Sequence, residues 1–65
     1  MNWDRIQGQW QQVQGEAKKR WGQLSDDDMM EVEGNRDKLE GKIQERYGYS
    51  KDRVKREVDE WINDM

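Results

Sequence analysis

Residues 34–48 read GNRDKLEGKIQERYG, and this stretch matches residues 8–22, GQWQQVQGEAKKRWG, at a fixed offset of 26 positions. Both stretches carry glycine at their first, eighth and fifteenth positions, arginine at the thirteenth and an aromatic residue at the fourteenth. Apolar residues also fall at the same two places, which Leu39 and Ile43 occupy in the second stretch. The shared pattern indicates an internal duplication of a helical unit.

Outward from this stretch, apolar residues continue at steps of three or four, which is the period of one face of a helix. A shorter series with helical spacing follows Ser50. The duplication puts a boundary near Gly34, and the chain contains no proline and no strand-like alternation. We predict an all-α bundle of about four helices, arranged as two helical hairpins, from segments at about Trp3–Trp21, Asp26–Tyr47 and Lys51–Asn63. The sequence leaves open whether the middle segment breaks near Gly34.

The ends of the two halves are also alike. Residues 21–25, WGQLS, and residues 47–50, YGYS, each place glycine after an aromatic residue and a serine shortly after the glycine. The pattern predicts a helix end with glycine in the left-handed conformation, followed by Ser25 and Ser50 as the N-caps of the next helices. The acidic run at 26–28 then lies in a first helical turn, where carboxylates complement the helix dipole.

Composition leaves little apolar material for a core. Of 65 residues, 31% are hydrophobic and 42% are charged, which is close to the composition of disordered chains. Four tryptophans and two tyrosines compensate, because a buried aromatic ring removes a large area from water. We therefore predict one folded domain over residues 1–65, with a core that includes Trp10, Val13, Trp21, Leu39, Ile43 and Tyr47.

The absence of cysteine and histidine excludes disulfides, thiol nucleophiles, imidazole bases and the usual zinc sites. The acidic residues Asp26, Asp27, Asp28 and Glu31 lack the spacing of a calcium loop. We predict no catalytic residue, no metal and no cofactor. The net charge of −3 argues against nucleic acid and anionic membranes as partners, and no apolar run is long enough to span a bilayer. We expect a cytoplasmic protein.

Basic side chains cluster at 18–20 and at 51–56. Each cluster could touch phosphate, but acidic residues lie four positions away from several of these side chains. Such pairs are typical of a solvated helix surface. Two packed helical hairpins also resemble helix-hairpin-helix DNA-binding modules, yet the connections at 22–24 and 48–49 are a poor match to their phosphate-binding loops. The sequence favours a solvated surface over nucleic-acid binding.

Four glycines stand inside the predicted helices. Gly8 and Gly15 fall on the face opposite the apolar residues, and the duplication repeats them as Gly34 and Gly41. An interior helix glycine costs about 0.8–1 kcal/mol relative to alanine. Either these glycines lie on an open surface of a marginally stable protein, or another backbone packs against them. We favour the open surface, and name Gly8, Gly15, Gly34, Gly41 and Trp3 as the interaction surface if a partner exists.

The chain resembles the CsbD-like family over nearly its whole length. The resemblance rests on Asn2-Trp3-Asp4, the Trp10 and Gly15 spacing, WGQL at 21–24, the acidic turn, the whole of 34–48 and the closing VDEW at 58–61. It implies a small bacterial general stress-response protein that folds as two roughly orthogonal helical hairpins, similar to SAM-like folds. It implies no catalytic residues.

Two functions remain open from the sequence. The first is a non-enzymatic protein that protects macromolecules under osmotic, stationary-phase or drying stress, for which the high glycine content and the mean hydropathy of −1.55 are typical of hydrophilins. The alternative is a protein-interaction module that binds a protein partner through the glycine-lined face or an exposed tryptophan. We expect a monomer or a weak homo-oligomer in either case.

Overall fold

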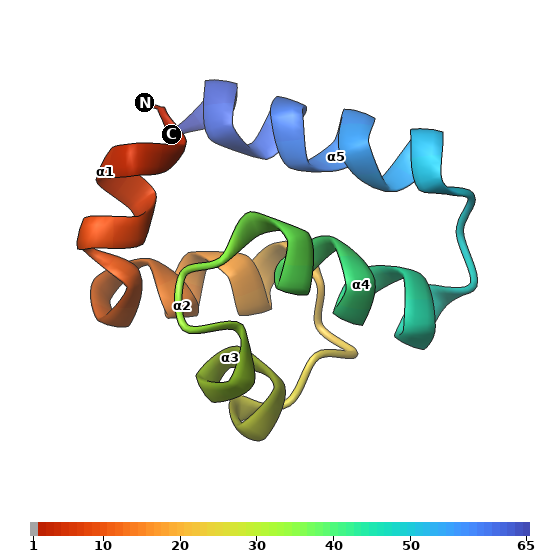
Figure 1. The fold of residues 1–65 in the computed structure, drawn as a ribbon, viewed down its shortest axis with the longest axis horizontal. Helices are drawn as coiled ribbons and strands as arrows, with labels where there is room; N and C mark the ends of the chain where they lie inside the picture. The colour runs from red at the N-terminus through yellow and green to blue at the C-terminus, as the bar shows by residue number, and fades with distance from the viewer. Residues whose placement is uncertain (1) are drawn as a thin grey trace.

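The computed structural model describes residues 2–65 and is helical without strands over that range (Figure 1). The described residues form five helices, where the sequence predicts about four. They are α1 (Trp3–Gly8), α2 (Trp10–Arg20), α3 (Asp26–Val32), α4 (Arg36–Tyr47) and α5 (Lys51–Asp64). The fold is thus the small helical bundle that the apolar spacing predicts.

The additional helix arises because the predicted segment from Trp3 to Trp21 breaks at Gln9. The backbone at Gln9 leaves helical geometry, with φ −118° and ψ 28°, while its N–H still donates to the carbonyl oxygens of Arg5 and Ile6. The break near Gly34, which the sequence left open, is present in the structure, since Glu33 and Gly34 both have positive φ, at 51° and 79°. The two breaks make α2 and α4 begin 26 residues apart, at the predicted offset, although the duplication itself stays a prediction.

Side-chain caps begin four of the five helices. Ser25 and Ser50 cap α3 and α5 as predicted, and Asn2 and Asn35 cap α1 and α4. Gly48 ends α4 with φ 70°, also as predicted. The same prediction is wrong for the glycine after Trp21, which does not have positive φ: α2 ends when the Trp21 N–H donates to Ala17 O, and the chain then turns through a bond from Leu24 N to Trp21 O.

Helix α4 lies between α3 and α5 and packs against both (Figure 1). With α5 it forms one of the predicted hairpins, whereas α3 packs mainly on α4 rather than on α2, the preceding helix in the chain. The chain changes direction at both ends of α3, through the turn at 21–25 before it and the positive-φ residues at 33–34 after it.

The buried core collects apolar side chains from all five helices and from the turn after α2. Five of the six predicted core residues are buried, and Tyr47 is the exception: it is half-buried, packs against the core and accepts a hydrogen bond from Gln23 N. Buried apolar residues are Ile6, Trp10, Val13, Ala17, Trp21, Leu24, Met29, Val32, Leu39, Ile43, Val54, Val58, Trp61 and Ile62.

Tryptophan supplies polar anchors as well as apolar area. The indole N–H of Trp10 donates to Met29 O at 2.9 Å and ties α2 to α3. The indole N–H of Trp21 donates to Glu57 Oε1 at 3.2 Å, and its ring meets Trp61 edge to face at 5.3 Å between centroids. A buried indole needs such a partner, so these bonds fix how the helices are placed against one another.

Candidate functional site

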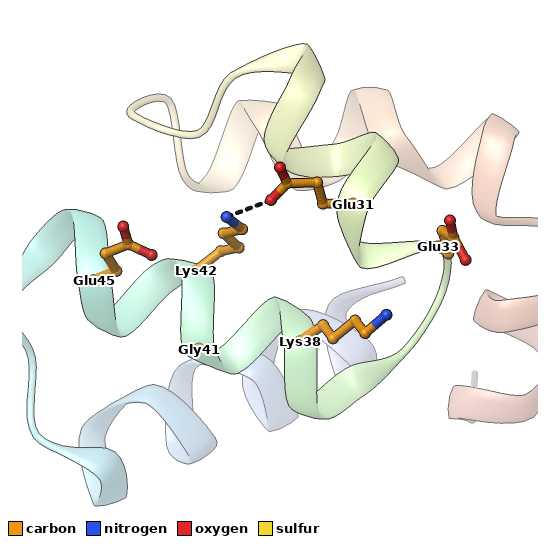
Figure 2. Close-up of a pocket in the computed structure, with 6 residues that line it drawn as sticks. All are labelled: Glu31, Glu33, Lys38, Gly41, Lys42 and Glu45. Carbon is orange, nitrogen blue, oxygen red and sulfur yellow. Dashed lines mark ion pairs between the residues drawn. The ribbon is translucent and has the colours of Figure 1, made fainter.

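A shallow groove lies between α3 and α4 (Figure 2). It has a volume of about 570 Å³ and is lined by Glu31, Glu33, Lys38, Gly41, Lys42 and Glu45. Figure 2 shows Lys42 reaching across to Glu31, while Lys38 and Glu45 lie toward opposite ends of the groove. Charged side chains of both signs line a wide opening, so the groove offers no dry pocket in which a small substrate would be enclosed.

Near Lys42 of this groove, Asp28 is the only buried charged residue within 2–65. Its carboxylate accepts two hydrogen bonds from the Arg46 guanidinium, each 3.1 Å, and one from Ser25 N at 3.0 Å. Lys42 Nζ stands 3.7 Å from the same carboxylate. The Arg46 hydrogen bonds, followed by the Ser25 bond, lower the pKa of Asp28 from 3.8 to about 2, against the opposing effect of burial.

The sequence located Asp28 in the acidic first turn of α3 but did not single it out from its neighbours. Asp28 is the third residue after Ser25, and the structure shows the two in a reciprocal capping box. A serine followed three residues later by a carboxylate is the sequence pattern of a capping box, and it could have distinguished Asp28 from the other two aspartates. Its pairing with Arg46 could not be seen, because 18 residues separate the two and only the packing of α3 on α4 brings them together.

The five residues predicted as an interaction surface do not share one environment. A Cβ added at Gly8, Gly15 or Gly41 would meet no neighbouring atom within 4 Å, so these three glycines face open space. At Gly34 it would lie 3.1–3.3 Å from atoms of Gln7. Trp3 is half-buried, with its indole N–H donating to Gly34 O at 2.9 Å. Trp3 and Gly34 therefore meet in an internal contact, and only the other three are surface glycines.

The described residues contain no group of three or more acidic side chains placed to hold a metal ion. None of the helices in 2–65 has the length and apolar character to cross a bilayer. Seven of the twelve lysines and arginines form ion pairs, such as Arg36 with Glu40 and Asp59, each at 2.7 Å. The geometry presents a charged surface with many ion pairs, and the α3–α4 groove is one of its hollows.

A family model described as CsbD-like matches residues 4–56. The chain belongs to the CsbD-like family. It is 57% identical to the UPF0337 protein YjbJ of Escherichia coli O6:H1, over 94% of this chain and 88% of that protein. It is 52% identical to a UPF0337 protein of Rhodopseudomonas palustris, over all of this chain and 98% of that protein. No solved structure matches significantly. The CsbD-like family is associated with the general stress response.

The Asp28–Arg46 pair makes the stability of this CsbD-like protein dependent on pH in acid. The folded-state pKa of Asp28 is about 2 and the ordinary value is 3.8, so the unfolded chain binds the proton first. The stabilisation is fully present above pH 3.8, and it is lost as the pH falls toward 2. Urea denaturation at steps between pH 5 and pH 2 should show the free energy of unfolding decreasing over this window.

The variant Asp28→Asn isolates that contribution from those of the other carboxylates. It should lower the free energy of unfolding near neutral pH by about 1–3 kcal/mol, because Arg46 loses its charged partner. Below pH 3 the difference between wild type and variant should shrink. Two curves that run parallel from pH 5 to pH 2 would show that Asp28 has no special part in the acid response.

The open glycines of the CsbD-like protein predict stabilising substitutions. Gly15→Ala and Gly41→Ala should each raise the free energy of unfolding by up to about 1 kcal/mol, since each lies inside a helix with free space for a methyl group. Gly8 ends α1, so Gly8→Ala should have a smaller effect. The measurement is the urea midpoint of each variant, with sedimentation to detect association. A loss of stability at both Gly15 and Gly41 would mean that another surface packs there.

Proposed function

We propose that this CsbD-like protein is a non-enzymatic, cytoplasmic stress-response protein that protects other macromolecules under osmotic, stationary-phase or drying stress. The observation that carries the proposal is the division between core and surface. Large apolar side chains are collected in the core, and within residues 2–65 only Met30 and Met65 are exposed among them. A surface of this kind stays hydrated and resists self-association as water is lost.

The surface of ion pairs and bare glycines supports the same role. The pairs of Lys18 with Asp26 and of Arg20 with Glu60 are exposed, and exposed pairs contribute little to stability. Glycine also occupies helix positions where alanine would stabilise the fold, at Gly8, Gly15 and Gly41. A protein acting through bulk hydration and weak contacts needs no more specific surface than this.

A drying assay tests the proposal. A labile enzyme is dried and rehydrated with this protein over a range of molar ratios, and the recovered enzyme activity is measured. An equal mass of an unrelated small helical protein is the control, and Lys38→Ala and Glu45→Ala are the surface variants. We expect recovery to rise with the ratio, to exceed the control and to be unchanged in both variants. Recovery equal to the control at every ratio would refute a protective role.

The α3–α4 groove favours a second candidate, an interaction module. Within residues 2–65, Lys38 and Glu45 form no ion pair, and Gly41 leaves the groove without a side chain at its position. Both features would suit a partner that brings its own charged and apolar groups. The matched variants are Gly41→Gln, which fills the groove, and Gly15→Gln, which adds the same side chain to α2. A saturable protein partner bound by wild type and Gly15→Gln but lost in Gly41→Gln would favour the module.

A further inference from the structure

The two exposed large apolar side chains of residues 2–65 are both methionines. Met30 is 65% exposed on α3 and Met65 is 39% exposed at the end of the chain. Met29, the residue before Met30, is completely buried in the core. The consecutive pair thus places one thioether in water and one inside the protein, on the same short helix.

Exposure decides how a thioether responds to an oxidant. A peroxide must reach the sulfur atom, and the product sulfoxide is polar and larger than the thioether. At Met30 the sulfoxide would stand in water, where its polarity has no burial penalty. At Met29 the same product would place a polar oxygen among apolar core side chains.

The contacts described for α3 do not involve the Met30 side chain. The Asp28 carboxylate binds Arg46 on α4, and the Met29 carbonyl oxygen accepts the indole N–H of Trp10 on α2. Val32 and the Met29 side chain provide the buried apolar contacts of the helix. Oxidation of the Met30 sulfur leaves all of these interactions intact.

We propose that Met30 is an oxidation site for peroxides, with Met65 as a second site, and that the protein stays folded when Met30 is oxidised. The O–O bond of the peroxide breaks, one oxygen atom becomes bonded to the sulfur, and the other leaves as water or as an alcohol. The sulfur is oxidised by two electrons and the peroxide is reduced by two. The site goes beyond the protective role proposed above and does not depend on it.

Burial makes the reaction selective between adjacent residues. Met29 reacts only from molecules in which its part of the core has opened, and a folded domain of this size leaves at most about one molecule in a hundred open. Met30 reacts from the folded state without any opening. We expect Met30 to be oxidised at least about tenfold faster than Met29, a conservative margin for a short helix that opens locally.

The test treats the full chain with dilute hydrogen peroxide at neutral pH. Intact mass counts the oxygen atoms added over time, and peptide mapping assigns each one to a position, so that oxidation of Met1 is scored separately. Met30→Leu is the matched variant, because leucine preserves the apolar surface and cannot be oxidised. We expect it to lose one oxygen addition while Met65 reacts as before. Circular dichroism of the Met30-oxidised protein should show a thermal midpoint within about 3 °C of the unoxidised protein.

Two results would overturn the proposal. One is oxidation of Met29 at the same rate as Met30, which would show that the core opens too readily to protect it. The other is a large fall in the thermal midpoint when Met30 alone carries the oxygen, which would show that its side chain supports the fold.

Discussion

Leu39→Ala should lower the free energy of unfolding by about 2–5 kcal/mol, the range for removing a fully buried leucine side chain. Leu39 is 0% exposed and lies on α4, which packs against both α3 and α5. A domain of this length has a total stability of about 3–10 kcal/mol. The loss is a large share of that stability, so the variant should unfold at a much lower urea concentration, and Ile43→Ala, at an equally buried position, should behave similarly.

Equilibrium urea denaturation followed by tryptophan fluorescence measures the effect. Gln44→Ala is the control, because Gln44 is an exposed residue of the same helix and its substitution should change the free energy of unfolding by no more than about 0.5 kcal/mol. Midpoints for Leu39→Ala and Ile43→Ala that match that of Gln44→Ala would contradict the placement of α4 at the centre of the core.

Gly34→Ala should destabilise the protein by about 2–4 kcal/mol, from backbone strain and overpacking together. Gly34 has φ 79°, a conformation in which a Cβ is unfavourable by about 1–2 kcal/mol. The new methyl group would also lie 3.3 Å from the Gln7 Cα and carbonyl oxygen, which belong to a backbone that cannot rotate away. The same shift would disturb the bond from the Trp3 indole to Gly34 O.

Gly48→Ala separates the two causes. Gly48 has a similar φ of 70°, but a Cβ there would meet nothing within 4 Å. This variant should lose only the strain, about 1–2 kcal/mol. Urea denaturation gives the loss of stability of each variant. The extra loss in Gly34→Ala over Gly48→Ala is the cost of the close approach of α1 to the α3–α4 connection. Equal losses at Gly34 and Gly48 would mean that α1 does not pack against this connection in solution.

Local chemistry in the sequence was enough to predict the helical class, most helix ends and most of the core. Apolar steps of three and four identify the buried face whatever the helix packs against, because the period belongs to the helix itself. Helix caps interact with the adjacent backbone, so the sequence alone predicts them, as it did for Ser25, Ser50 and Gly48. The repeat at an offset of 26 pointed to a boundary near Gly34, but it left open whether the helix breaks there.

Tertiary structure decided what depends on distant partners. The glycines at 8, 15, 34 and 41 form one repeated pattern in the sequence, yet only Gly34 meets another backbone, because α1 folds back over the α3–α4 connection. The capping box with Ser25 sets Asp28 apart locally, but only packing on α4 supplies Arg46 and excludes water. Close approaches and ion pairs are relations between segments, and no periodicity within one segment contains them.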